Sequence, residues 1–214
     1  MHPNFEKLDE EKKKRILSGA MEEFRQYGFE KASTIQIAKN AGISKGALFN
    51  YFHRKKDLYA YLIDYGMQVI ESFYEKIDLE ERDLFRRLEQ IGLIKLHTQQ
   101  KYPHVFDFLT STREEDSSEV KDLIAEKTEA VYQQGIGKIY ANIDYSKFRE
   151  GIDIEKAAEI LNWTMLGFAE KSVKEIGTYQ KLDQLGEQYL KEWGVYADLL
   201  KNCFYKDDDT ADRE

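Results

Sequence analysis

The sequence has little that breaks a helix and almost no cysteine. Its 214 residues include two prolines, Pro3 and Pro103, and one cysteine, Cys203. A single cysteine excludes an internal disulfide framework or a cluster of thiolates on a metal, and it favours a reducing compartment, for which we expect the cytoplasm. No apolar run approaches the roughly 20 residues of a membrane-spanning helix, and the charged N-terminus does not resemble a signal peptide. We therefore expect no membrane partner.

What remains is a composition typical of an all-α globular protein. Apolar residues make up 42% of the chain and charged residues 34%, which argues against a disordered or membrane-embedded chain. Scarce proline favours helices, and no run of alternating β-branched residues indicates a sheet. The length suggests a small domain joined to a larger one. We place these domains at residues 1–54 and 55–205, followed by a disordered acidic tail at 206–214.

The net charge of -8 is unevenly distributed along the chain. Residues 1–56 contain 12 Lys or Arg and 7 Asp or Glu, a net charge of +5. Residues 57–214 contain 20 Lys or Arg and 33 Asp or Glu, a net charge of -13. A basic head on an acidic body suits contact with DNA through the head alone, because phosphate repels the body.

Apolar residues at spacings of three and four, glycines and hydroxyl-bearing caps divide the chain into helices. We expect helices at about residues 9–27, 33–41, 45–52, 55–77, 82–100, 103–112, 115–141, 153–177 and 179–204. Gly28 is expected to end the first of them, with Phe29 folding back on its apolar stripe. Residues 142–151 are the most loop-like stretch between helices.

Residues 33–52 fit a helix-turn-helix, in which two short helices are joined by a tight turn. Ser33 and Ser44 are placed to cap the two helices, and Gly42 permits the sharp turn. The second helix of such a unit enters the major groove of DNA. The expected inner core consists of Ile37, Ala38, Ile43, Leu48 and Phe52.

Residues 33–52, with the sequence STIQIAKNAGISKGALFNYF, resemble the DNA-binding signature of the TetR family of bacterial transcriptional regulators. Lys55, Leu58 and the preceding helix extend the resemblance over about residues 12–60; beyond them only length and helicity agree. The resemblance implies a three-helix DNA-binding head, a larger helical ligand domain and a homodimer closed by the last two long helices. It also implies a small-molecule effector that shifts the helix at about 55–77, so that the regulator, most commonly a repressor, leaves a pseudo-palindromic operator.

Three positions depart from the family pattern. Phe49 stands where tyrosine is most common, and it lacks the hydroxyl that contacts phosphate. Ile35 replaces a frequent polar contact, and Arg54 occupies the usual cap position before the fourth helix. These departures move the expected DNA contacts toward other residues of the head.

Residue type suggests which head residues touch bases and which touch phosphate. Lys45 suits guanine, Ala47 a thymine methyl group and Asn50 adenine. Hydroxyl and ammonium groups suit phosphate. The full candidate set is Ser33, Thr34, Ser44, Lys45, Gly46, Ala47, Phe49, Asn50, Tyr51 and Lys55, of which Ser33, Thr34, Tyr51 and Lys55 are the phosphate candidates.

Some charged and hydroxyl groups of the head have an alternative structural role. Ser33 and Ser44 fit helix capping as well as DNA contact. For residues 12–15, a run of four basic side chains, a solvated face is favoured over a basic arm on the DNA backbone.

The last two long helices carry too many large apolar residues for an ordinary half-exposed pair, so we favour a subunit interface over core packing. These residues are Ile160, Leu161, Met165, Phe168, Leu182, Leu185, Tyr189, Trp193, Tyr196, Leu199 and Leu200. Gly167, Gly186 and Gly194 would permit close helix crossing.

Aromatic side chains of the larger domain suit a cavity for a small, largely apolar effector. The candidates are Phe73, Phe85, Phe106, Phe108, Tyr132 and Trp163, although each also fits an ordinary core. No cofactor and no metal are expected. His97 and His104, near Asp107, are the nearest approach to a catalytic or metal site, and core or surface histidines are the preferred interpretation.

Two other classes stay open. An all-α enzyme lacks a recognisable catalytic constellation in this sequence. A constitutive DNA-architectural protein would carry more positive charge and a smaller body.

Overall fold

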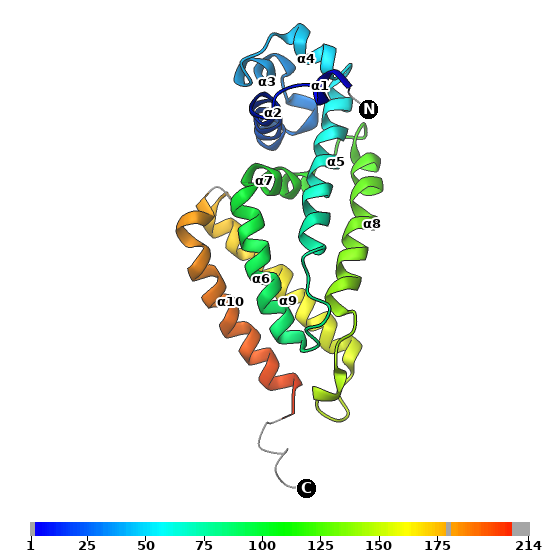
Figure 1. The fold of residues 1–214 in the computed structure, drawn as a ribbon, viewed down its shortest axis with the longest axis vertical. Coiled ribbons are helices and arrows are strands. Elements are labelled where there is room, and N and C mark those ends of the chain that lie inside the picture. The colour runs from blue at the N-terminus through cyan, green and yellow to red at the C-terminus, as the bar shows by residue number, and fades with distance from the viewer. Residues whose placement is uncertain (1–2, 179–180, 207–214) are drawn as a thin grey trace. The chain divides into compact units, whose positions relative to one another are not determined.

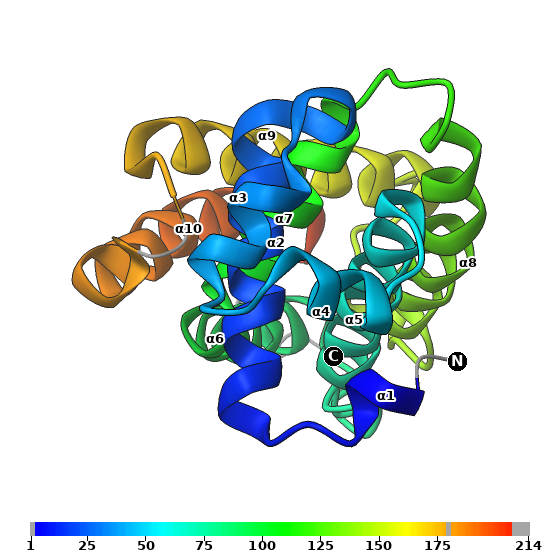
Figure 2. The ribbon, with the colours of Figure 1, turned by 90° about the horizontal axis from the view of Figure 1, so that it is seen from above.

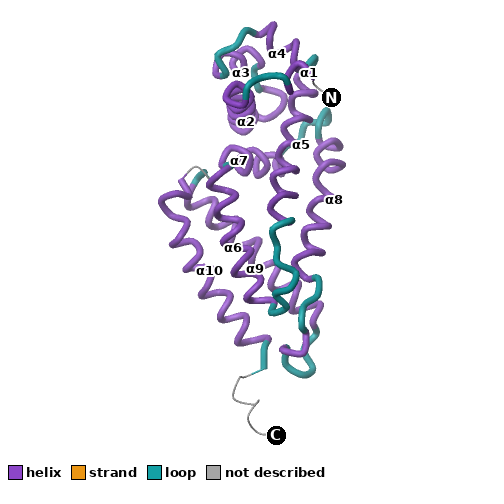
Figure 3. The backbone as a smooth tube through the Cα atoms, in the orientation of Figure 1, coloured by secondary structure: helices purple, strands orange, loops and turns teal. Residues whose placement is uncertain are grey.

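The computed structural model describes residues 3–178 and 181–206, and most of them are helical (Figure 1; Figure 3). The α-helices are α1 (Pro3–Glu6), α2 (Glu10–Lys31), α3 (Thr34–Asn40), α4 (Lys45–Tyr51), α5 (Lys55–Tyr74), α6 (Leu84–Lys101), α7 (Pro103–Ser111), α8 (Lys121–Tyr140), α9 (Ile154–Ile176) and α10 (Leu182–Phe204). Two short 3-10 helices, η1 (Thr112–Glu114) and η2 (Tyr145–Lys147), lie in connections. The expected all-α fold is confirmed. The expected disordered tail falls, beyond Lys206, outside the described residues.

Two helix boundaries differ from expectation by more than three residues. Gly28 interrupts α2 with φ 68° and ψ 177° but does not end it, because residues 29–31 add a further turn. Helix α8 begins at Lys121 instead of residue 115. In the intervening loop the Glu115 carboxylate accepts from Ser117 N and the Ser117 hydroxyl accepts from Glu119 N, and such side-chain bonds compete with helix formation.

The head is built on α2, which has α3 on one side and α7 on the other (Figure 1; Figure 2). Most of the expected inner core is buried, since Ile37, Ala38, Leu48 and Phe52 are at most 2% exposed. Ile43 is only partly buried because it lies in the turn. Burying these apolar groups stabilises the two short helices, which would be marginal alone.

The short helix α1 was not expected from the sequence. It buries the ring of Phe5 completely. The centroid of that ring lies 4.9 Å from the Phe52 centroid and 5.2 Å from the Tyr61 centroid. Tyr61 also donates a hydrogen bond to Glu6 at 2.8 Å. Helix α1 therefore covers the inner side of α4 and the start of α5.

Two compact units make up the described chain. The first comprises residues 3–74 and 101–135, and the second comprises residues 75–100 and 136–206, apart from 179–180. The division proposed from the sequence, 1–54 and 55–205, concerns functional domains and stays a prediction.

In the first unit, an aromatic cluster joins α2, α5 and α7. Tyr59 of α5 is 2% exposed, and its ring centroid lies 4.9 Å from that of Phe24, 5.2 Å from Phe29 and 5.4 Å from Phe108. The contacts are edge-to-face, a favourable geometry for aromatic pairs. Burial raises the pKa of the Tyr59 hydroxyl, with the charge of Glu115 adding to the effect. This cluster connects the head to the helices below it.

In the second unit, the guanidinium of Arg87 joins three segments. Arg87 of α6 is fully buried and donates hydrogen bonds to the backbone oxygens of Ile139 and Ala141, at the end of α8. It also donates to the backbone oxygens of Leu79 and Glu81. Burial lowers the pKa of Arg87, while carbonyls at a helix C-terminus stabilise its charge. The end of α8 and the start of α6 are thereby fixed together.

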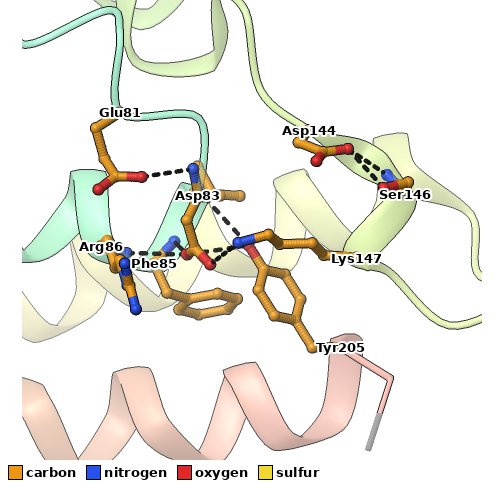
Figure 4. Close-up of polar contacts among 9 residues, drawn as sticks. Glu81, Asp83, Phe85, Arg86, Asp144, Ser146, Lys147 and Tyr205 are labelled. Atoms are coloured by element: carbon orange, nitrogen blue, oxygen red, sulfur yellow. Dashed lines mark hydrogen bonds and ion pairs between the residues drawn. The ribbon is translucent and has the colours of Figure 1, made fainter. Parts of the chain in front are cut away.

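A second polar cluster fixes the end of α10 (Figure 4). Asp83 Oδ1 caps α6 by accepting from Phe85 N and Arg86 N, and its Oδ2 lies 2.8 Å from Lys147 Nζ. The Tyr205 hydroxyl donates to Asp83 Oδ1 at 3.3 Å. Burial raises the pKa of Asp83, but the Lys147 ammonium and the Arg86 amide outweigh it, so that the pKa is lowered overall.

The contact of α5 with α8 gives a stability prediction. A Cβ at Gly135 would lie 2.0 Å from Cζ of Tyr74, so Gly135→Ala must displace that ring, at about 1–3 kcal/mol. Gly137 has nothing within 4 Å of the same position. Gly137→Ala should stabilise α8 by about 0.5–1 kcal/mol, because alanine loses less backbone entropy. Thermal unfolding measures both changes. Shifts of the same sign would contradict the Tyr74 contact.

Candidate nucleic-acid interface

The two helices of the helix-turn-helix begin at hydroxyl caps. Ser33 Oγ accepts from Gln36 N at 3.3 Å, and Ser44 Oγ accepts from Ala47 N at 3.1 Å. Both serines have extended backbone conformations, as N-caps require. The capping role expected for them is present. A direct contact of either hydroxyl with DNA stays a prediction.

Gly42 forms the turn between α3 and α4. Its φ of 67° is one that side chains rarely allow, which explains glycine at this position. Ile43 N donates to Ala38 O at 2.9 Å and closes the turn. Ala38 and Ala41 are buried and small, so α3 and α4 can approach closely.

Helix α4 turns its polar side outward. Leu48 and Phe52 occupy its buried side, whereas Lys45, Gly46 and Asn50 are exposed. These three residues are candidate base contacts or lie beside them, and the structure leaves all three accessible. The Lys45 ammonium lies 5.7 Å from the centroid of the Phe49 ring.

The other head candidates are partly buried. Thr34, Ala47, Phe49 and Tyr51 are each intermediate in exposure. The rings of Tyr51 and Phe5 lie edge-to-face at a centroid distance of 6.1 Å. Each of these side chains therefore combines packing with access to the surface.

Ile35 of α3 lies on the outer side of the head and is 60% exposed. It thus stands out as an apolar group among polar neighbours. Gln36 and Asn40, on the same helix, are hydrogen-bonded to each other at 2.7 Å.

Lys55 has a role inside the head. Its ammonium donates to the backbone oxygen of Glu30 at 2.9 Å and lies 3.5 Å from that of Ala32. It also lies 4.7 Å from the centroid of the Phe29 ring. Cations stabilise carbonyls at a helix C-terminus and the faces of aromatic rings. Lys55 therefore holds the end of α2, and we expect this role to take the place of the phosphate contact predicted from the sequence.

Glu23 was not singled out in the sequence, although it positions the helix-turn-helix. Its side chain is 5% exposed, and Oε1 accepts from Ser33 N at 2.9 Å. The bond joins α2 to the cap of α3. A glutamate within an otherwise apolar stripe was the only signal for it.

The effector candidates fall in both units. Phe73, Phe106 and Phe108 are buried in the first unit, where Tyr132 is partly buried. Tyr132 lies near Tyr74, whose pKa is raised to about 12 by burial and by Tyr132.

In the second unit the two effector candidates differ in exposure. Phe85 is buried, with its ring centroid 5.0 Å from that of Tyr205. Trp163 is 66% exposed on α9. Their assignment to an effector site stays a prediction.

No helix in the described part of the chain is long and apolar enough to cross a membrane. Over residues 3–178 and 181–206, no group of three or more His, Cys, Asp or Glu side chains could hold a metal ion.

Residues 16–62 match the family model described as bacterial regulatory proteins, tetR family. This part of the chain is similar to the DNA-binding segment of TetR-family regulators. The match covers α3, α4 and most of α2, which carry the geometry described above. Regulators of the TetR family bind DNA operators, dimerise and bind small-molecule ligands.

A curated transcriptional regulator is similar to part of this chain. The HTH-type transcriptional regulator RutR of Escherichia coli K12 is 32% identical over 94 residues. The aligned part covers 43% of this chain and 43% of RutR, so the match spans less than half the length of that relative.

Solved TetR-family structures share the fold of this chain. A regulator from Chloroflexus aurantiacus gives a TM-score of 0.69 at 22% identity and covers 96% of this chain and 98% of its own. FadR of Bacillus subtilis, solved in complex with stearoyl-CoA, gives a TM-score of 0.51 at 20% identity. That match covers 83% of this chain and 95% of the FadR chain.

The position of Lys55 gives a prediction that separates two roles. Lys55→Ala should destabilise the head by about 1 kcal/mol or more, because charged hydrogen bonds to two carbonyls are lost. The slope of log affinity against log salt should stay unchanged, whereas loss of a phosphate contact would reduce it by about 0.9. Thermal unfolding and DNA titrations at several salt concentrations measure the two effects.

Lys56→Ala is the matched control, because it removes the same charge one residue along, from a side chain that is likewise partly buried. A shallower salt slope for Lys55→Ala alone would show that Lys55 binds phosphate.

Proposed function

We propose that this chain is a ligand-responsive transcriptional regulator that acts as a repressor. It would bind a pseudo-palindromic operator as a homodimer. A small, largely apolar effector would release it. The observation that carries the proposal is the geometry of α4, whose buried side is held by Leu48 and Phe52 while Lys45, Gly46 and Asn50 are exposed. A helix so presented fits the major groove.

The residues proposed to read bases are Lys45, Ala47 and Asn50. Lysine donates to guanine, an alanine methyl packs against a thymine methyl, and asparagine pairs with adenine. Thr34 and Tyr51 remain proposed phosphate contacts. The net charge of +5 over residues 1–56 supports approach of the head to DNA.

The proposed subunit interface is the α9–α10 face, defined here as the exposed apolar residues of the two helices: Ile160, Trp163, Leu166, Leu185, Val195, Tyr196 and Leu199. Each helix also has a buried side, with Leu161 and Phe168 on α9 and Trp193 on α10. The apolar residues of these helices thus divide between core packing and an exposed face. Exposed apolar residues gathered on one pair of helices are typical of protein interfaces.

The glycines of the same helices also divide between packing within the chain and the exposed face. A Cβ at Gly186 would lie 2.7 Å from Leu96 of α6, so this glycine serves packing within the chain. Gly167 and Gly194 have nothing within 4 Å. Both leave room for a second subunit. Leu182, which also belongs to the interface predicted from the sequence, lies outside the side chains that the structure describes.

Two observations support an apolar effector, the fold relationship and the buried aromatic residues. FadR of Bacillus subtilis shares this fold and was solved with stearoyl-CoA. Aromatic residues proposed to contact the effector are buried on α5 and α7, and Phe108 touches Tyr59, which touches the head. We propose an unidentified apolar metabolite as the ligand, in a cytoplasmic protein without catalytic function.

Binding of duplex DNA tests the proposal. Wild-type protein should select a two-fold related sequence from a random pool. Asn50→Ala and Lys45→Ala should each relax the preference at one base pair of each half-site, at about 1–3 kcal/mol. Thr34→Ala should weaken binding to all sequences alike. Selection followed by titration of the selected duplex and its single-base variants measures these effects.

A uniform loss for all three variants would contradict the division into base and phosphate contacts. Absence of any selected sequence for the wild type would contradict the proposed function itself. Sequence-independent binding at low salt alone would instead favour the architectural alternative.

The subunit interface gives a separate prediction. Trp163→Glu and Leu199→Glu should each weaken the dimer at least about 100-fold, because a charge replaces a large apolar group at an interface centre. Ile136→Glu is the matched control, because Ile136 is an exposed isoleucine of α8, outside the α9–α10 face. Sedimentation velocity over a concentration series measures dissociation. A wild-type monomer, or equal behaviour of the three variants, would contradict this interface.

A further inference from the structure

The break in α2 leaves a backbone donor that a distant side chain binds. At Gly28 the backbone leaves the helical region, so the hydrogen-bond ladder is interrupted. Phe29 N instead donates to Glu115 Oε2 at 2.7 Å, across 86 positions of sequence. A bond between a carboxylate and a backbone amide is charge-assisted and stronger than a neutral one. Glu115 thus supplies the acceptor that the helix no longer provides.

Glu115 is itself held in place by its own loop. Its second oxygen, Oε1, accepts from Ser117 N at 3.0 Å, and its backbone N donates to Thr112 O at 3.3 Å. Thr112 and Ser117 are both buried. The carboxylate therefore bridges α2 and the loop that directly follows α7 and η1, instead of extending freely from the surface.

Gly28 lies directly beside this bridge. A Cβ at position 28 would lie 3.4 Å from Glu115 Oε2, and φ of 68° disfavours any side chain there. The positive φ is therefore what requires glycine at this position.

The segment that Glu115 holds leads directly into the helix-turn-helix. Residues 29–32 connect the break to Ser33, the cap of α3. Lys55 binds the carbonyls of this segment from α5, whereas Glu115 binds its amide from beyond α7. Together with Glu23, which binds Ser33 N, these two side chains of opposite sign therefore set the path of the chain into α3.

We propose that Glu115 is a positioning residue for DNA binding, which holds the Phe29 amide and so fixes α3 and α4 relative to α7. This inference rests on the proposed function. Helix α7 reaches the head by a second route, through Phe108 and Tyr59. A displacement of the end of α7 is therefore transmitted to the helix-turn-helix by a polar contact as well as by an aromatic one.

Titrations of the full chain with a duplex selected by the wild type test this role. Glu115→Ala should weaken binding by about tenfold, the scale of one charged hydrogen bond. Asp116→Ala is the matched control, because Asp116 is the exposed acidic neighbour. Charge alone predicts slightly tighter binding for both variants, since each removes repulsion from phosphate. Weaker binding of Glu115→Ala only is therefore specific to positioning.

Two further variants and a second measurement complete the test. Glu115→Gln keeps an oxygen for Phe29 N and should recover most of the affinity. Glu115→Asp keeps the charge but has a shorter side chain, so it should bind the duplex weakly. If Glu115→Ala fails to fold, the affinity of Glu115→Asp decides whether Glu115 has the positioning role. Amide hydrogen exchange should accelerate in residues 28–34 of each weakly binding variant and stay unchanged in α9.

Several results would overturn the proposal. Equal affinities of Glu115→Ala and Asp116→Ala would do so, as would full affinity of Glu115→Asp. Weak binding with unchanged exchange in residues 28–34 would also contradict it. Failure of the wild type to select any duplex is a different result, which contradicts the proposed function.

Discussion

The geometry of the head depends on which side chains form hydrogen bonds with the backbone at the end of α2, after the break at Gly28. A helix that ends inside a protein leaves amides and carbonyls that need partners. Here Lys55 takes the carbonyls of Glu30 and Ala32, and Glu115 takes the amide of Phe29. The ring of Phe29 then packs beneath Lys55 and beside Tyr59. Because these partners come from α5 and from beyond α7, the start of α3 is set by the body of the protein as much as by the head.

With that start fixed, the exposed side of α4 follows from burial. Glu23 holds the amide of Ser33, Gly42 provides the turn, and Leu48 and Phe52 fill the inner side. The polar residues of α4 therefore lie on its outer, exposed side. This arrangement exposes the polar residues of a basic head, although the chain as a whole is acidic, with a net charge of -8. The distribution of charge, and not its total, is what the proposed function requires.

Features that depend on near neighbours in sequence could be predicted, and features that depend on distant ones could not. The caps at Ser33 and Ser44 and the turn at Gly42 use bonds within a few residues, and the structure contains all three. The binding of Phe29 by Glu115 spans 86 positions, and that of Glu30 by Lys55 spans 25. Neither has a local pattern. The start of α8 is an exception. The sequence placed it too early, although the bonds that organise the preceding loop, from Ser117 N to the Glu115 carboxylate and from Glu119 N to the Ser117 hydroxyl, are local.

The aromatic cluster explains why a signal from the body would reach the head at all. Tyr59 is almost completely buried between Phe24 and Phe29 on one side and Phe108 on the other. Protein interiors are packed as densely as organic crystals, so a ring in such a site cannot absorb a shift of its neighbour. A ligand that binds one position of α7 better than another would therefore also favour one position of α2. The DNA-binding helix would then follow, because its start is held by the same segment.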